Sequence, residues 1–134
     1  MKQVLVTGGG GFLGKAVVRK LLRENIGVTS FSRHLHPTLI QMGVPQIQGD
    51  LTDADAVRHA VKGMDTVFHV AARPGVWGPY ESYYAVNVTG TKNVVDACRS
   101  AGVARLIYTS SPSVVFDEND MENADESVPY PDTY

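Results

Sequence analysis

Short apolar runs alternate with longer stretches of helical periodicity along the chain. The apolar runs predict strands over residues 4–6, 27–32, 44–48, 66–70 and 105–109. Between them, apolar residues recur at spacings of three and four, which predicts helices that begin at Phe12 and that cover 38–42, 53–62 and 82–101. The run at 66–70 is nearly all apolar, as expected of a parallel strand buried on both faces. The alternation predicts an α/β domain built on a parallel sheet.

The first strand leads directly into a glycine-rich stretch, residues 7–14, with the sequence Thr-Gly-Gly-Gly-Gly-Phe-Leu-Gly. Strand, glycine turn and helix form the context that a dinucleotide-binding fingerprint requires. We expect Gly8 to adopt a positive φ in a tight turn, Gly11 to let the backbone approach a pyrophosphate, and Gly14 to allow close packing. The N–H groups of residues 11–13 then face the phosphates. The alternative is a glycine-rich turn that binds nothing.

The second strand ends at Ser32-Arg33, where dinucleotide-binding folds carry an acid that accepts hydrogen bonds from the adenosine ribose. That acid is absent here. An arginine suits the 2′-phosphate of NADP, which an acid would repel. We therefore expect NADP(H) to be preferred, with NAD as the other candidate. Alternatively, Arg33 is a solvated loop residue.

An acid and an aliphatic residue, Asp50-Leu51, follow the third strand. The carboxylate can accept a hydrogen bond from the adenine amino group, and Leu51 can cover the ring. The alternative is that Asp50 helps to cap the next helix. Because Thr52 and Asp55 already resemble a capping box, we favour the contact with adenine.

The fourth strand ends in His69-Val70-Ala71-Ala72. Small side chains at the carboxyl end of a strand let a cofactor approach the crevice of an open sheet. We interpret His69 as a hydrogen-bonded structural residue rather than a proton donor. The Gly/Pro loop that follows carries the only tryptophan, Trp77, which either contacts an apolar substrate or packs within the loop.

The helix predicted over 82–101, with Gly102 as its stop, contains two unusual positions. Gly90 lies in mid-helix, where glycine costs about 1 kcal/mol relative to alanine, so we expect close packing against the sheet or the cofactor. Asn87, if it lies on a buried face, needs hydrogen-bond partners.

Hydroxyl side chains follow the fifth strand, in Thr109-Ser110-Ser111-Pro112-Ser113. At the carboxyl end of a central strand they point into the cofactor crevice; the alternative is a simple serine turn. The predicted cofactor-binding residues are therefore Gly8, Gly11, Phe12, Leu13, Gly14, Ser32, Arg33, Asp50, Leu51, Val70, Ala71, Ala72, Thr109 and Ser110.

Composition narrows the class of protein. The 134 residues are enough for one domain with a hydrophobic core, and 43% hydrophobic and 19% charged residues are ordinary for a globular protein. No apolar run approaches the roughly 20 residues of a membrane span. Cys98 is the only cysteine, which excludes an internal disulfide, and we interpret it as a small core residue. We expect a cytoplasmic protein.

The net charge of −2 is unevenly distributed. Residues 1–116 carry 12 Lys/Arg against 7 Asp/Glu, a balance of +5, whereas residues 117–134 carry 7 acids and no Lys or Arg. The acidic stretch predicts a solvated loop, and the dispersed basic residues do not favour nucleic-acid binding. His34 and His36 have no third ligand nearby, which argues against a metal site.

Five motifs occur in the order found in the extended short-chain dehydrogenase/reductase, or NAD-dependent epimerase/dehydratase, superfamily. They are Thr7-Gly8-x-x-Gly11-Phe12-Leu13-Gly14, Asp50-Leu51, His69-x-Ala71-Ala72, Asn87-Val88-x-Gly90-Thr91 and Tyr108-Thr109-Ser110-Ser111. Three further segments resemble the 3β-hydroxysteroid dehydrogenase-like branch: residues 75–78, 110–116 and 129–131. We expect a Rossmann-type doubly wound parallel sheet in the order 3-2-1-4-5, with helices on both faces.

By that resemblance, Ser111 matches the catalytic serine that hydrogen-bonds the substrate oxygen, and Asn87 matches the asparagine that supports proton relay. The family also uses a tyrosine acid/base with a lysine four residues later. Residue 134 is only 23 positions past Ser111, and no Tyr-x-x-x-Lys occurs; Tyr134 is a candidate whose lysine is missing. We therefore expect residues 1–134 to be an NAD(P)-binding domain without its C-terminal substrate lobe, and inactive alone.

The resemblance implies an NAD(P)-dependent oxidoreductase that interconverts a ketone and a secondary alcohol on a bulky apolar small molecule, sterol-like or a 3-oxoalkanoate. One alternative is a nucleotide-sugar epimerase or dehydratase, although such enzymes usually keep the acid that Ser32 replaces here. Another is a non-catalytic dinucleotide-binding module. The fifth strand would form an unpaired edge, which leaves room for a homo-oligomer.

Overall fold

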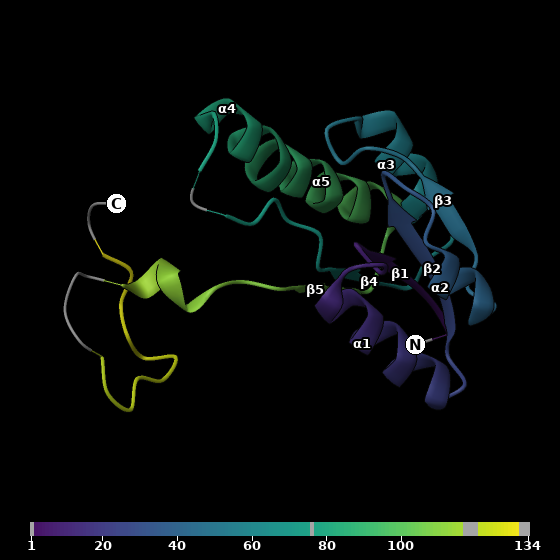
Figure 1. The fold of residues 1–134 in the computed structure, drawn as a ribbon, viewed down its shortest axis with the longest axis horizontal. Coiled ribbons are helices and arrows are strands. Elements are labelled where there is room, and N and C mark those ends of the chain that lie inside the picture. The colour runs from purple at the N-terminus through teal and green to yellow at the C-terminus, as the bar shows by residue number, and fades with distance from the viewer. Residues whose placement is uncertain (1, 76, 117–120, 132–134) are drawn as a thin grey trace.

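A parallel sheet forms the centre of the computed structural model, which describes residues 2–75, 77–116 and 121–131. Within these residues the sheet has five strands in the order β3-β2-β1-β4-β5, and every neighbouring pair is parallel (Figure 1). The strands are β1 (Gln3–Thr7), β2 (Gly27–Ser32), β3 (Gln46–Gln48), β4 (Thr66–His69) and β5 (Arg105–Tyr108). The predicted fold class and strand order are confirmed.

Helices cover both faces of the sheet, with α1 on one side and α3 and α5 on the other (Figure 1). The helices are α1 (Phe12–Arg23), α2 (Pro37–Gln41), α3 (Ala54–Val61), α4 (Tyr80–Tyr83) and α5 (Thr91–Ala101). A π-helical segment, η1 (Tyr84–Gly90), joins α4 to α5, and a 3₁₀ turn, η2 (Pro112–Val115), follows β5. None of the described helices is long and apolar enough to cross a membrane.

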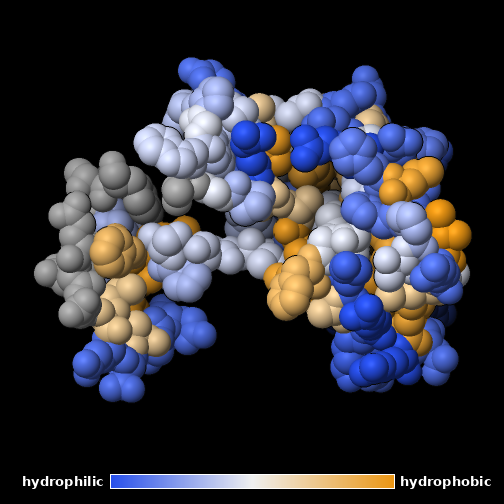
Figure 2. Space-filling view, viewed as in Figure 1, coloured by the Kyte–Doolittle hydropathy of each residue, from blue (hydrophilic) through white to orange (hydrophobic). Residues whose placement is uncertain are grey.

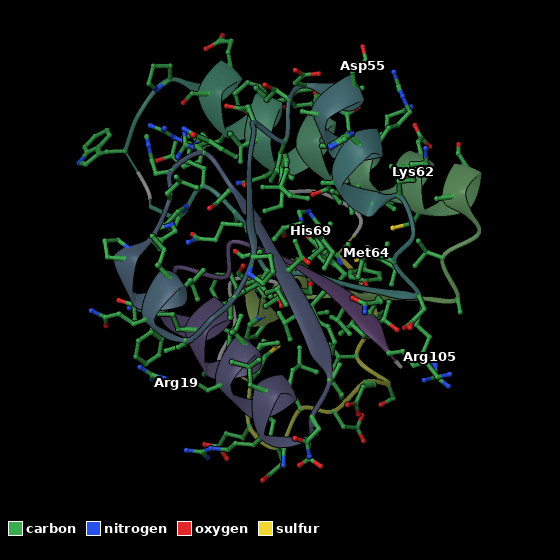
Figure 3. All side chains as sticks on the ribbon, turned by 90° about the vertical axis from the view of Figure 1, so that its right-hand side faces the viewer. Arg19, Asp55, Lys62, Met64, His69 and Arg105 are labelled. Carbon is green, nitrogen blue, oxygen red and sulfur yellow. The ribbon has the colours of Figure 1, made fainter. Side chains whose placement is uncertain are left out.

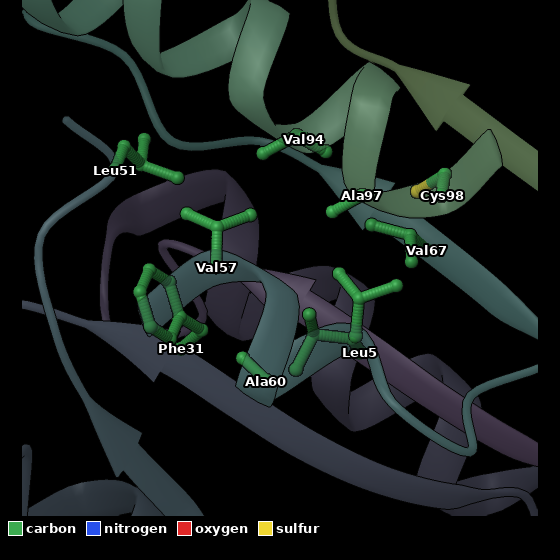
Figure 4. Packing of buried hydrophobic residues seen from close by; sticks show 10 residues of the cluster. Leu5, Phe31, Leu51, Val57, Ala60, Val67, Val94, Ala97 and Cys98 are labelled. Carbon is green, nitrogen blue, oxygen red and sulfur yellow. The ribbon is translucent and has the colours of Figure 1, made fainter. Parts of the chain in front are cut away.

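The alternation of side chains along β1 divides the core into two halves. Leu5 contributes to a cluster with residues of α3 and α5, including Val57 and Val94 (Figure 4). Val4 and Val6 point to the opposite face and pack with residues of α1 and α2. Both faces of β1 are therefore buried, as a central parallel strand requires.

The boundaries of three elements differ from the sequence prediction. The third strand starts at Gln46 rather than at residue 44, because the backbone N–H of Val44 donates to the carbonyl of Leu39 and so closes the end of α2. Asp53, not Thr52, caps α3, since its carboxylate accepts hydrogen bonds from the backbone N–H groups of Asp55 and Ala56. The helix predicted from residue 82 begins at Tyr80 and widens into the π turn of η1.

The end of α5 agrees with the prediction, because Gly102 adopts the left-handed conformation with φ of 67°. Cys98 is buried in the core, as predicted, and burial raises the pKa of its thiol. Beyond β5, an edge strand of the sheet, the described chain runs away from the body of the domain (Figures 1 and 2). The start of the predicted acidic loop, residues 117–120, lies outside the described residues.

Candidate functional site

A cavity of about 350 Å³ opens at the carboxyl edge of the sheet, beside the start of α1. It is lined by Gly8, Gly11, Phe12, Leu13, Gly14, Phe31, Ser32, Arg33, His34, His36, Gly49, Asp50, Leu51, Val70, Ala71, Ala72 and Val86. All the predicted cofactor residues therefore line one cavity, except Thr109 and Ser110. Their role toward a cofactor stays a prediction.

Two of the glycines in the first turn are required by the fold itself. Gly8 has φ of 70°, and a Cβ atom there would lie 2.9 Å from the Cα atom of Ala71. A Cβ atom on Gly14 would lie 2.1 Å from the carbonyl oxygen of Gly8. These residues let the turn pack tightly between β4 and the first turn of α1.

Gly11 differs from both. Its φ of −74° suits any residue, and an added Cβ atom would meet only the carbonyl oxygen of Gly8, at 3.3 Å. Gly11 caps α1 without a side-chain hydrogen bond, and the first turn of that helix carries no acid. The backbone N–H of Gly11 itself donates to the carbonyl of Gly8 at 3.0 Å, so it is the N–H groups after Gly11, with the positive end of the helix dipole, that the helix start presents to the cavity, an arrangement suited to phosphate. Phe12 beside it is 96% exposed.

A buried hydrogen-bond network ties the glycine turn to the end of β4. The hydroxyl of Thr7 accepts from the backbone N–H groups of Val70 and Ala71, at 3.1 and 3.2 Å. It lies 2.8 Å from Nδ1 of His69, whose Nε2 lies 3.0 Å from the hydroxyl of Thr91. Because both lone pairs of the Thr7 oxygen are used, its proton goes to Nδ1, so His69 carries its own proton on Nε2.

Burial among these neighbours lowers the pKa of His69 to about 4. Neutral His69 thus acts as one acceptor and one donor between two threonines. Figure 3 shows His69 in the interior of the domain. This geometry agrees with the structural role predicted for His69.

The far end of the cavity, where β2 and β3 end, combines a cation and an anion. The hydroxyl of Ser32 donates to the carbonyl of His34 at 2.8 Å, and the carbonyl of Arg33 accepts from the side chain of Gln48 at 2.8 Å. A hydrogen bond from the backbone of Thr52 is the main cause that lowers the pKa of Asp50, and the charge of Arg33 adds to it. An ionised carboxylate and an exposed guanidinium therefore share this wall.

Asp50 also makes local contacts, which the sequence reasoning treated as the less favoured alternative. One carboxylate oxygen accepts from the backbone N–H and the hydroxyl of Thr52, both at 2.9 Å. We expected Thr52 to cap the helix and to leave Asp50 free of local contacts, but Asp53 takes that place. The contact between Asp50 and adenine stays a prediction, and it would fall to the second carboxylate oxygen.

His36 is a wall residue that the sequence reasoning missed as a cofactor contact. The side-chain amide of Gln46 accepts from its backbone N–H at 2.8 Å and donates to its carbonyl at 3.2 Å. A Cβ atom on Gly10 would lie 2.1 Å from the imidazole ring, so the ring lies directly against the glycine turn. No sequence signal pairs positions 10, 36 and 46, because their proximity arises only in the folded chain.

The remaining missed wall residues are Phe31, His34, Gly49 and Val86. Each is next to, or one residue removed from, a position that the motifs did identify. Their lining role follows from the path of the loops rather than from a recognisable pattern.

Asn87 and Gly90, the two unusual positions of the predicted long helix, both contact other segments in the structure. Asn87, within the π turn, accepts from the backbone N–H of Arg73 at 2.8 Å and donates to its carbonyl at 3.1 Å. A Cβ atom on Gly90 would lie 2.8 Å from Cβ of Leu51, so the glycine packs closely as predicted, but against the turn after β3 rather than against the sheet. The π turn and the glycine thus hold two loops of the carboxyl edge against the helix.

Ser111 lies outside the cavity lining. Its hydroxyl lies 2.8 Å from that of Ser113 and accepts from the Ser113 backbone N–H at 3.3 Å, which caps the turn η2. The backbone N–H of Thr109 donates to the carbonyl of His69 at 3.0 Å. The structure therefore shows a local serine turn here, at the carboxyl edge of the sheet but exposed to solvent.

Trp77 is exposed, although its carbonyl accepts from the hydroxyl of Tyr83 at 2.5 Å. The indole ring therefore does not pack within the loop. Neighbouring Val76 and the distant Tyr134 lie outside the described residues. Among the residues that the structure describes, no group of three His, Cys, Asp or Glu side chains could hold a metal ion.

The sequence matches a known protein family over nearly its whole length. Residues 5–134 match the 3-beta hydroxysteroid dehydrogenase/isomerase family. The chain belongs to this family. It is 55% identical over 112 residues to a 2-alkyl-3-oxoalkanoate reductase of Stenotrophomonas maltophilia, covering 84% of the chain and 34% of that protein. It is 42% identical over 134 residues to the human sterol-4-alpha-carboxylate 3-dehydrogenase, decarboxylating, covering 96% and 34%.

Solved structures of the wider superfamily share the fold of this family member. A UDP-glucose 4-epimerase of Thermus thermophilus in complex with NAD matches with a TM-score of 0.85 and 31% identity, over 96% of this chain and 44% of that one. A short-chain dehydrogenase/reductase protein of Agrobacterium tumefaciens with bound NAD gives 0.82 and 33%, over 96% and 39%. The chain spans about a third of the length of the curated relatives named above.

Proposed function

We propose that the chain supplies the cofactor-binding part of an NAD(P)-dependent oxidoreductase that interconverts a ketone and a secondary alcohol on an apolar substrate. The observation that carries this proposal is Gly11. Its φ does not require glycine, and an added Cβ atom would meet one backbone atom, the carbonyl oxygen of Gly8, which a small shift would relieve; yet Gly11 faces the cavity at the start of an uncapped helix without any side chain. A pyrophosphate that approaches the backbone closely explains the missing side chain.

The rest of the cavity suits the other parts of such a cofactor. Phosphates would lie at residues 11–13, adenine between Asp50 and Leu51, and the nicotinamide half beside Ala71 and Ala72. We infer that NADP(H) is preferred over NAD(H), because Arg33 lines the ribose end and Ser32 brings no carboxylate there.

The bound cofactor would supply the hydride, and the substrate carbonyl oxygen must gain a proton. We assign Ser111 to hydrogen-bond that oxygen once its hydroxyl turns from Ser113. Asn87 would hold the loop at Arg73 in place and support the relay of protons. Since no Tyr-x-x-x-Lys occurs in the sequence, we propose that the acid/base pair and the substrate lobe are supplied from outside residues 1–134.

We infer the substrate class from the two curated relatives. One is a reductase of a 2-alkyl-3-oxoalkanoate, and the other is a 3-dehydrogenase of a sterol 4-carboxylate. In both compounds the carbon that carries the reacting oxygen is separated by one carbon from a carboxylate. We propose an apolar 3-oxo acid, or the corresponding 3-hydroxy acid, as the substrate.

The deciding experiment is calorimetry of NADPH binding to the full-length protein and to its Gly11→Val variant. We expect the valine side chain to block the phosphates and to abolish measurable binding. Ala101→Val, at the exposed far end of α5, is the matched control and should bind NADPH like the parent. Unchanged affinity of Gly11→Val would remove the phosphate site and the proposed function with it.

A nucleotide-sugar substrate is the main competitor, because the Thermus epimerase shares the fold closely. Ser32 argues against it, since the ribose-binding acid usual in sugar enzymes is missing. Turnover of a UDP-hexose but of no hydroxy acid would favour the competitor.

A further inference from the structure

Arg73 is a cation with no acidic partner among the residues that the structure describes. Ala72, the preceding residue in the loop after β4, lines the cavity, whereas Arg73 does not. Its guanidinium stacks on the ring of Tyr83, with 4.9 Å between the Cζ atom and the ring centroid. Its Nε atom is buried and has no hydrogen-bond partner, and no salt bridge involves Arg73 among the described residues.

The position of this guanidinium is held on several sides. Asn87 binds both the N–H and the carbonyl of the Arg73 backbone. The Tyr83 ring beneath it is anchored through its hydroxyl to the carbonyl of Trp77. A Cβ atom on Gly78, where φ is 138°, would lie 3.4 Å from a terminal nitrogen of Arg73, so the loop passes close over the guanidinium. An arginine fixed in this way loses little conformational freedom when it binds an anion.

The sheet places Arg73 and Ser111 in loops that start at the same edge. In the parallel pair β4–β5, His69 lies opposite Tyr108, and the backbone N–H of Thr109 donates to the carbonyl of His69 at 3.0 Å, so the two following segments start from the same edge of the sheet. Arg73 comes four residues after His69, and Ser111 comes three residues after Tyr108. The segment with this cation thus starts at the same edge of the sheet as the segment with the serine assigned to the substrate oxygen.

We propose that Arg73 binds the carboxylate of a 3-oxo or 3-hydroxy acid substrate and so determines specificity for acids. The assignment rests on the proposed function, which it deepens. A guanidinium binds a carboxylate through two parallel hydrogen bonds and fixes the orientation of the neighbouring carbons. The cofactor's pyrophosphate is the other candidate anion, but its place is at the start of α1 and Arg73 lies outside that cavity.

The test compares a 2-alkyl-3-hydroxyalkanoic acid with its methyl ester, which lacks the charge, as substrates of the full-length protein with NADP⁺. We expect Arg73→Gln to lower kcat/KM for the acid about tenfold to a hundredfold, as for loss of a charge-assisted contact. The value for the ester and the dissociation constant of NADPH should stay within about twofold. Arg73→Lys, which keeps the charge, should recover part of the preference for the acid.

Arg105→Gln is the matched control, because Arg105 is an exposed arginine at the opposite end of β5 (Figure 3). Arg105→Gln should leave kcat/KM unchanged for both the acid and the ester. Equal losses on acid and ester in Arg73→Gln would overturn the assignment, and weaker NADPH binding with an unchanged acid-to-ester ratio would reassign Arg73 to the cofactor. If the parent turns over neither compound, calorimetry with the acid distinguishes failure of the carboxylate site from failure of the proposed function. Binding that Arg73→Gln abolishes supports the carboxylate site while the proposed function fails, and absence of binding overturns the site as well.

Discussion

Thr7→Val tests the network that joins the glycine turn to β4. Valine has nearly the shape of threonine, so the substitution removes a hydroxyl and creates no cavity. It leaves two backbone N–H groups, those of Val70 and Ala71, and Nδ1 of His69 without their shared partner. The free energy of unfolding should therefore fall by the cost of burying three polar groups without hydrogen-bond partners.

The magnitude follows from the burial of these groups. Each buried polar group without a partner costs about 1–3 kcal/mol, and the two long N–H contacts lie at the low end of that range. We therefore expect Thr7→Val to lower the free energy of unfolding by about 3–5 kcal/mol, a large share of the roughly 5–15 kcal/mol typical of a domain. Thr91→Val leaves only Nε2 of His69 without a hydrogen-bond partner and should lower the free energy of unfolding by about 1–2 kcal/mol.

Urea unfolding of the full-length protein at pH 7.5, followed by far-ultraviolet circular dichroism, measures both values. Thr7→Ser keeps the hydroxyl and should lose about 1 kcal/mol, the contribution of one methyl group. Thr29→Val, on the neighbouring strand β2, has no side-chain hydrogen bond among the described residues and is the control for threonine-to-valine exchange in the sheet. If Thr7→Val costs no more than Thr91→Val, the shared-acceptor network does not exist in solution.

Two further predictions concern charge. Because the folded pKa of His69 is about 4, below its ordinary 6.5, the unfolded chain binds the proton first. The free energy of unfolding is therefore highest above pH 6.5 and falls by about 3 kcal/mol as the pH drops to 4. In His69→Gln, urea titrations at several pH values should show a much smaller fall. Arg33→Ala should weaken NADPH about tenfold to a hundredfold and NADH little, as measured by calorimetry; equal affinities of the parent for both cofactors would defeat the preference.

Local chemistry explains why the sequence alone predicted most residues of the cavity at the carboxyl edge of the sheet. Gly8, Gly14 and the helix that starts at Phe12 form a turn whose conformation depends on neighbours within a few residues. The order of the strands follows from right-handed crossovers, which leave few alternatives once strands and helices alternate. Strand ends then converge at one edge, which brings Asp50 and Ala71 to the same cavity without any knowledge of side-chain contacts.

The prediction for Asp50 shows where local reasoning fails. Thr52, Asp53 and Asp50 are all residues that can cap a helix or close a turn, and their sequence does not rank them. In the folded chain the helix begins at Ala54, which makes Asp53 the cap and turns Asp50 toward Thr52. A shift of one residue in the start of the helix decided the partners of all three.

Contacts between distant segments were decided only by the tertiary structure. The proton position on His69 depends on Thr7, 62 residues earlier, and on how many donors already occupy that hydroxyl. The unpaired guanidinium of Arg73 depends on Tyr83 and on a π turn that lets Asn87 reach the loop. The sequence determines which polar groups exist and which elements carry them. Which of them are paired, and which are left for a ligand, depends on distances and burial that only the packed chain sets.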